Sequence, residues 1–162
     1  MLARLAWTQT GSNDFGGDVF NSKMEHDAHY TDGTTAGKAD ILFADTRTIT
    51  SGGTDDLDLA GSLSNAFGAT ITAAEVVAIF IKSAAANTTN LTVGVGTNPL
   101  SGWLGGTTPT VGPIRPGGVL LRAETDAAGL CAVTAGTGDI LRIANASGAA
   151  ATYQIAILAR TA

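Results

Sequence analysis

The stretch Val76-Val77-Ala78-Ile79-Phe80-Ile81 is the longest apolar run in the sequence, and it decides the fold class. Every residue except Ala78 is Val, Ile or Phe, and the run has no amphipathic face, as expected of a strand buried on both sides. A helix is the competing interpretation, because Thr72-Ala73-Ala74-Glu75 matches a capping box and residues 69–93 contain no Gly or Pro. We favour the strand, because β-branched residues dominate the run.

Further strand candidates lie on both sides of this run and are separated by turns rich in Gly, Pro, Asn and Asp. One begins at residues 41–43 and continues through residues 46–49, and the others cover residues 57–59, 91–95, 119–123, 130–134, 140–144 and 153–158. This spacing amounts to about eight strands and favours an antiparallel β-sandwich or barrel. A short helical turn is predicted at residues 63–67, with Gly68 as its stop.

The charges divide the chain unequally. Residues 1–60 carry ten acids and four bases, a net charge of −6, whereas residues 61–162 carry four acids and five bases, a net charge of +1. Residues 8–40 are polar and rich in turn signals, so we predict an irregular N-terminal arm over residues 1–40 and a β-sandwich domain over residues 41–162. The aromatics of the arm are predicted to anchor it to a neighbouring subunit or to its own domain. They are Trp7, Phe15, Phe20 and Tyr30.

Composition excludes several classes of partner and favours self-association. Lys and Arg are scattered singly through residues 61–162, so there is no basic cluster for nucleic acid. An apolar run of six residues is too short to cross a membrane, and no apolar signal-peptide core is expected after Arg4 and Trp7. Charged residues make up 14% of the chain, which is low for a soluble monomer and favours an oligomer over a monomer with a Thr/Ser/Asn surface.

Residues with chemical potential do not form a recognisable motif. His26 and His29 have Glu25, Asp27 and Asp32 nearby. No third ligand follows at metal-site spacing, so a solvated loop is favoured over zinc. Asp55-Asp56-Leu57-Asp58 lacks the EF-hand pattern, which argues against calcium. No cofactor is predicted.

Catalytic arrangements are equally weak. The sequence has no Gly-x-Ser-x-Gly elbow, and Glu75 and Glu124 are the only glutamates after residue 60 that could pair for glycoside hydrolysis. Cys131 lies in an apolar stretch and is predicted to be a buried small hydrophobe. Trp103 is interpreted as a loop residue that caps one end of the sandwich, with a ligand-facing aromatic as the alternative. We therefore expect no enzyme.

Several phrases of the sequence resemble a family of small structural proteins of tailed bacteriophages. They are Tyr30-Thr31-Asp32-Gly33, Asp45-Thr46-Arg47-Thr48-Ile49, Asp55-Asp56-Leu57-Asp58-Leu59-Ala60-Gly61, Pro116-Gly117-Gly118-Val119-Leu120-Leu121 and Val133-Thr134-Ala135-Gly136-Thr137-Gly138-Asp139. The resemblance covers residues 30–160 and carries no catalytic residue.

The resemblance implies a jelly-roll type of sandwich, a homotrimer, and a place in the virion, most of all on the capsid surface. Such a protein is made in the cytoplasm of the host bacterium. It would act as a decoration or cement protein that binds the major capsid protein or another virion protein. The alternative is a tail or head fibre module that binds a host receptor or glycan, with Trp103 as the candidate contact.

Overall fold

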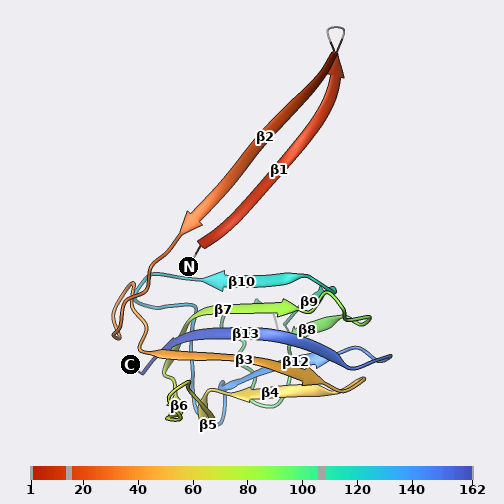
Figure 1. Ribbon diagram of the computed structural model, residues 1–162. Coiled ribbons are helices and arrows are strands. Elements are labelled where there is room, and N and C mark those ends of the chain that lie inside the picture. The colour runs from red at the N-terminus through yellow and green to blue at the C-terminus, as the bar shows by residue number, and fades with distance from the viewer. Residues whose placement is uncertain (1, 14–15, 106–108, 162) are drawn as a thin grey trace. The chain divides into compact units, whose positions relative to one another are not determined.

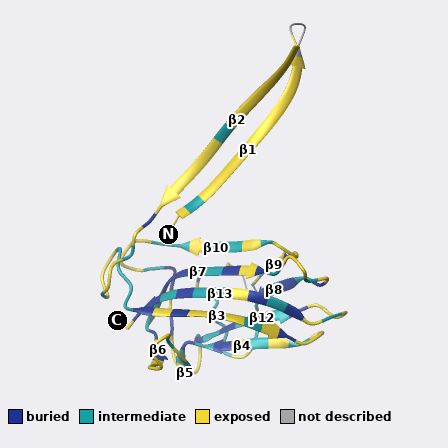
Figure 2. Cartoon of the chain, viewed as in Figure 1, coloured by how far each residue is buried: buried dark blue, intermediate teal, exposed yellow. Residues whose placement is uncertain are grey.

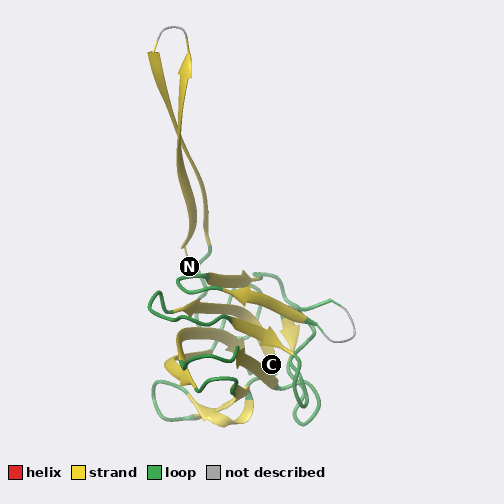
Figure 3. Cartoon of the chain, turned by 90° about the vertical axis from the view of Figure 1, so that its right-hand side faces the viewer, coloured by secondary structure: helices red, strands yellow, loops and turns green. Residues whose placement is uncertain are grey.

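The computed structural model describes residues 2–13, 16–105 and 109–161, and these residues form strands and loops without a helix (Figure 1, Figure 3). Two compact units divide the chain at residues 30 and 31. The first unit, residues 1–30, contains a two-stranded sheet, and the second, residues 31–162, contains the remaining strands and is called the body. Residues 31–40 belong to the body, whose first long strand begins at Ile41.

The first unit is an antiparallel ribbon of β1 (Leu2–Asn13) and β2 (Gly16–Asp27), paired in register from Leu2↔Asp27 to Asn13↔Gly16. The prediction of an irregular segment over residues 8–40 is therefore wrong for residues 8–13 and 16–27. A ribbon of two strands has no second layer, so side chains on both of its faces are exposed (Figure 2). Because neither face of the ribbon is buried, its residues do not alternate between apolar and polar. That alternation is the pattern by which a strand is recognised in a sequence, so the ribbon was not predicted.

The body has two antiparallel sheets. One has the strand order β10-β7-β13-β3, with β11 also paired to β7, and the other has the order β4-β12-β8-β9. A further two-stranded sheet pairs β5 with β6. The strands of the body are β3 (Ile41–Ile49), β4 (Thr54–Asp58), β5 (Ala60–Ser64), β6 (Thr70–Thr72), β7 (Glu75–Ser83), β8 (Leu91–Gly94), β9 (Thr110–Ile114), β10 (Val119–Ala123), β11 (Cys131–Ala132), β12 (Ile140–Asn145) and β13 (Ala151–Arg160).

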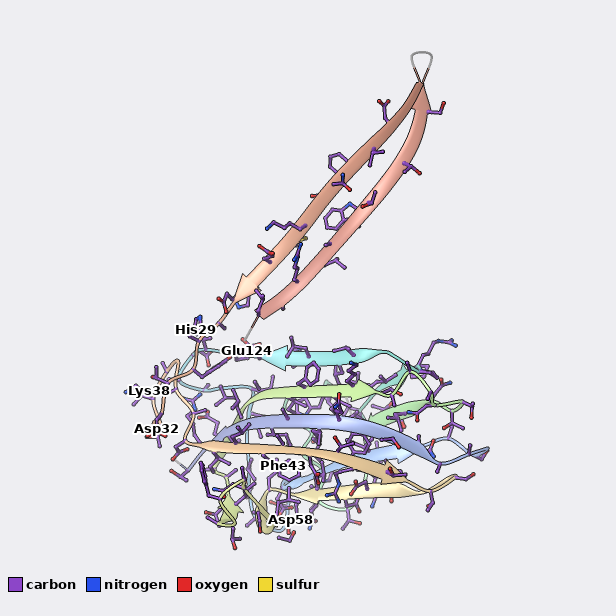
Figure 4. All side chains as sticks on the ribbon, in the orientation of Figure 1. His29, Asp32, Lys38, Phe43, Asp58 and Glu124 are labelled. Atoms are coloured by element: carbon purple, nitrogen blue, oxygen red, sulfur yellow. The ribbon has the colours of Figure 1, made fainter. Side chains whose placement is uncertain are left out.

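A single hydrophobic core fills the space between the two large sheets. Phe43, Ile79 and Ile157 enter it from one sheet, and Leu141 and Ile143 enter it from the other. Figure 4 shows Phe43 on β3 and Asp58 at the end of β4. Such face-to-face packing of two sheets makes the body an all-β, sandwich-like fold.

The decisive stretch at residues 76–81 lies within β7, so the prediction of a strand is confirmed and the alternative helix is wrong. Val76, Val77, Ala78, Ile79 and Ile81 are all buried. Strand β7 has paired strands on both edges, β13 on one and β10 with β11 on the other. This interior position satisfies the backbone of β7 on both edges, while Phe80 points away from the core and is only half-buried.

Two other local predictions need correction. Leu63 and Ser64 belong to β5, so the predicted helical turn at residues 63–67 is wrong. The Asn65 side chain instead accepts hydrogen bonds from the backbone N–H groups of Phe67 and Ala69, and Gly68 takes a positive φ of 81°. Strand β9 was not predicted because it contains Pro113, which an edge strand of this kind tolerates.

Candidate docking surface on the N-terminal ribbon

The register of the ribbon sorts its side chains into two different faces. Residues directly opposite each other in an antiparallel pair point to the same side, and successive residues point to opposite sides. One face carries the pairs Leu5↔Met24, Trp7↔Ser22 and Gln9↔Phe20. We call the large hydrophobic residues of this side the apolar ribbon face, which comprises Leu5, Trp7, Phe20 and Met24; all four are exposed.

The opposite side, the polar ribbon face, carries Arg4, Thr8, Asn21, Lys23 and Glu25 at its centre, and the exposed Leu2 and Val19 lie nearer its two ends. Glu25 accepts a hydrogen bond from Lys23 Nζ at 2.9 Å and forms an ion pair with Arg4 Nε at 3.3 Å. Thr8 Oγ1 donates to Asn21 Oδ1 at 2.6 Å. Exposed pairs of this kind add little stability, but they show that this side already has its own polar partners. The apolar ribbon face has no such compensation within the ribbon.

An isolated two-stranded hairpin is at best marginally stable in water, because it cannot bury an apolar face. The four residues of the apolar ribbon face expose roughly 100 Å² or more each, which makes a patch of the size that marks interaction sites. Burying even two such side chains on a partner is worth about 3 kcal/mol. The ribbon is therefore the best candidate in this chain for a surface that binds another molecule.

The structure brings together two of the four aromatics predicted as contacts. Trp7 and Phe20 lie on the same face, two register positions apart and diagonal to each other. Tyr30 follows β2 and is half-buried, and Phe15 lies outside the described residues. Leu5 and Met24 were missed, because only the pairing of β1 with β2 places them on this face. The signal in the sequence that could have revealed the pairing is the turn at Gly16-Gly17, next to the last pair of the ribbon.

Trp103, the predicted ligand-facing alternative, is buried in the core, and its indole N–H donates to the carbonyl of Leu100 at 3.0 Å. A buried indole has little surface to offer to a ligand. Cys131 is also buried, as predicted, and burial raises the pKa of its thiol to about 12. A thiol of this kind is protonated at neutral pH and is a poor nucleophile.

The candidate metal and catalytic residues are not assembled into a site. No group of three or more His, Cys, Asp or Glu side chains that could hold a metal occurs among the described residues. His29 contacts Asp27 at 3.2 Å, and His26 faces Ala3 across the ribbon. Glu75 contacts Arg160 at 3.1 Å and Glu124 contacts Arg122 at 3.4 Å, so each glutamate has its own cation.

The three aspartates at 55, 56 and 58 have three separate structural roles. Asp55 accepts from Arg47 and from the Tyr153 hydroxyl, where the O–O distance is 2.8 Å. Asp56 binds Arg142 through both carboxylate oxygens, and Asp58 accepts from the backbone of Ala60. Their carboxylates therefore fasten strands together and do not converge on one ion.

The Asp55 group joins the two sheets at one edge of the sandwich, because Arg47 and Tyr153 come from β3 and β13 and Asp55 comes from β4. Burial raises the pKa of Asp55, but the hydrogen bonds from Arg47 and Tyr153 lower it more, so its net pKa is below the ordinary value. Burial and the bond to Asp55 raise the pKa of Tyr153. The tyrosine is thus a stable hydrogen-bond donor to a carboxylate that stays ionised.

Comparisons with known proteins add no assignment. No protein-family model matches the chain, and neither the curated proteins nor the solved structures contain a significant match. The search for spans finds no helix among the described residues that is long and apolar enough to cross a membrane.

Proposed function

We propose that this chain is a non-enzymatic structural protein of a bacteriophage virion, and that it binds the outer shell as an oligomer and stabilises it. One observation carries the proposal: the ribbon has an apolar face that its own two strands leave exposed, and a polar face whose charges are already paired. A surface of this kind needs a partner. The phage-like phrases in residues 30–160 supply the class of partner, which is the major capsid protein or another virion protein.

The arrangement of the body supports a jelly roll, the fold that the resemblance implies. Eight strands make up its two large sheets apart from the short β11. In chain order, each of these strands is followed by a strand of the other sheet, except that β8 is followed by β9 in the same sheet. This alternation is expected of a double-sheet jelly roll with Greek-key connections, a common architecture of viral capsid proteins.

The proposed mechanism is attachment by an N-terminal arm and reinforcement by multivalency. The ribbon is the arm, its apolar face is the contact with the shell, and the body is the part that remains on the particle surface. If several copies associate, as in the homotrimer that the resemblance implies, each assembly presents several arms. Joint engagement then exceeds the affinity of one arm by a large factor.

Copy number tests where in the virion the protein works. Quantitative mass spectrometry of purified particles is expected to find hundreds of copies per particle, in proportion to the capsid protein. A handful of copies would contradict the decoration role and would indicate a tail or fibre component.

The two faces of the ribbon allow a matched test of the proposed contact. Phe20 and Val19 are neighbours, 61% and 63% exposed, and they point to opposite faces. We expect Phe20→Glu to weaken binding to particles by 10-fold or more, about 1.4 kcal/mol, because it places a charge in the buried contact. Val19→Glu is expected to leave binding within about threefold, measured by co-sedimentation. Equal losses for the two variants would contradict the assignment of the apolar ribbon face.

A further inference from the structure

The outer face of the β10-β7-β13-β3 sheet is unusually apolar for a surface that faces away from the core. Register places outward-pointing residues in rows that cross the four strands. The first row is Leu42, Leu158, Ala78 and Ala123, the second is Ala44, Ala156, Phe80 and Leu121, and the third is Thr46, Gln154, Lys82 and Val119. These twelve residues are called the outer face below.

Polar residues are expected at such positions, because an antiparallel sheet that packs on its core with one side normally turns a solvated side outward. The first two rows contain no polar side chain, and Lys82 is the one charged residue of the twelve. Leu42 is 48% exposed and Val119 55% exposed, at opposite edges of the face, while Phe80, Leu121 and Leu158 are half-buried. The pattern is that of a surface that another layer covers.

A projecting aromatic lies next to this face. Phe67, on the turn between β5 and β6, is 96% exposed, and together with Leu42 and Leu158 it lines a hollow of about 260 Å³. The turn is fixed by the Asn65 side chain and by the Gly68 N–H, which donates to the Asn65 carbonyl at 2.9 Å. A rigid turn that displays a phenyl ring loses little entropy on binding, which is typical of an interface anchor.

We infer that the outer face packs against the outer face of a second copy of this chain, around a two-fold axis. Its low charge is the first reason, although Asp32 and Asp40 line the hollow beside Phe67. With a single lysine and no carboxylate among its twelve residues, the face has no charge by which to select a charged partner. When two copies of the face meet, the only like-charge repulsion between the two sets of twelve residues is that between the two Lys82 side chains.

The sizes of the side chains give the second reason. On β3 and β13 the first row is large (Leu42, Leu158) and the second row is small (Ala44, Ala156). On β7 and β10 the order is reversed, with Ala78 and Ala123 small and Phe80 and Leu121 large. A two-fold axis parallel to the strands places β3 and β13 of one copy over β10 and β7 of the other. In both rows the large side chains of one copy then face the small side chains of the other, so the same patch is complementary to itself, as an isologous interface requires.

The size of the contact sets its expected strength. Four strands about 4.8 Å apart and three rows about 7 Å apart give a footprint on the order of 400 Å². A standard interface buries about 800 Å² per partner, so the rim with Phe67 must contribute and the association should be weak to moderate. The inference concerns the body alone and does not depend on whether the ribbon attaches to a particle. The two-fold dimer inferred from the outer face is a different assembly from the homotrimer that the resemblance implies.

Light scattering coupled to size-exclusion chromatography, on the full chain over a range of concentrations, tests the inference. We expect a mass of two chains at tens of micromolar and a single chain on dilution. Leu42→Glu combined with Val119→Glu should give a single chain at every concentration. Val95→Glu is the matched control, because Val95 is 42% exposed and lies outside the outer face, and it should keep the dimer.

Leu42→Ser with Val119→Ser is a milder pair for the same purpose, and circular dichroism checks that each variant retains the β spectrum. A single chain at all concentrations in the unmodified protein would overturn the inference. So would a double variant that keeps the dimer mass. A mass of three chains would overturn the two-fold arrangement, and a monomer that binds particles through Leu42 and Val119 would assign the face to a virion protein instead.

Discussion

Deleting residues 1–30 is expected to abolish attachment to the particle while the body keeps its fold. The deletion removes the whole of the apolar ribbon face, and burial of two of its four side chains would already be worth about 3 kcal/mol, more than 100-fold in affinity. The hydrophobic core that joins the two large sheets draws its residues from 41 to 159, so no member of it is lost. Co-sedimentation with particles that lack the chain measures the effect.

The deletion needs two controls. One shows that the body still folds, and the other shows that the loss of attachment is not due to losing the ion pairs of the polar ribbon face. Thermal unfolding followed by circular dichroism should show a cooperative transition in the truncated chain, close to that of the full chain. Arg4→Ala with Lys23→Ala, in the full chain, removes the ion pairs of the polar ribbon face and should leave attachment within a few-fold. Full binding by the truncated protein would refute the role of the arm.

Asp55→Ala is expected to lower the free energy of unfolding by about 3 kcal/mol, because it leaves the Tyr153 hydroxyl without its acceptor and leaves Arg47 with its bond to Asp45 alone. The Tyr153 hydroxyl belongs to a fully buried residue, and the Arg47 guanidinium makes its bidentate pair with Asp55 at 2.5 and 2.9 Å. Because these three residues come from three strands in two sheets, the loss weakens one edge of the sandwich. Urea denaturation at pH 7 measures the change.

Asp56→Ala is the matched control, since the neighbouring carboxylate makes a similar bidentate pair with Arg142 at 2.5 and 2.6 Å. The Asp56 side chain is 39% exposed and that of Asp55 is 13% exposed. Exposed ion pairs contribute about 0–1 kcal/mol, so we expect Asp56→Ala to have a small effect. Comparable losses in the two variants would show that burial at Asp55 does not determine the strength of its interactions.

The lowered pKa of Asp55 also gives a pH dependence with a defined sign. The folded state holds this carboxylate ionised at a pH where the unfolded chain, with an ordinary aspartate pKa near 3.9, would be protonated. Its contribution is therefore complete above about pH 4 and is lost as pH falls through the lower folded pKa. Asp55→Asn should remove this part of the acid sensitivity, and an unchanged difference in stability between pH 7 and pH 3 would contradict it.

Sequence reasoning identified most of the body strands whose residues face the core. Strand β10 begins and ends where the alternation and the Pro116-Gly117-Gly118 turn predicted, and β7 follows from its apolar run. The strands that it missed include the two of the ribbon, β9, and β6, whose three residues are too few to form a pattern although Ile71 is buried. Both strands of the ribbon are exposed on each side, and β9 contains proline. None of these three strands shows the alternation of apolar and polar residues on which the prediction depends.

The candidate site could be predicted only in part, for a related reason. Aromatic type alone selected Trp7 and Phe20, but their common face is a property of the register, and one residue of slip would place them on opposite faces. The outer face of the body is similar. Leu42, Phe80 and Leu121 are far apart in the sequence and come to lie on one face of the sheet through the pairing of β3, β13, β7 and β10.

Strand β13 has a consequence for the order of events during synthesis. Residues 151–160 form an interior strand that pairs with β3 on one side and with β7 on the other, partners made more than 60 residues earlier. Until the ribosome has released these residues, β3 and β7 each present an open edge, and the larger sheet cannot close. Nascent chains therefore pass through a stage with unpaired, apolar strands, when contact with other nascent chains is most harmful. The larger sheet is therefore completed only after residues 151–160 have left the ribosome.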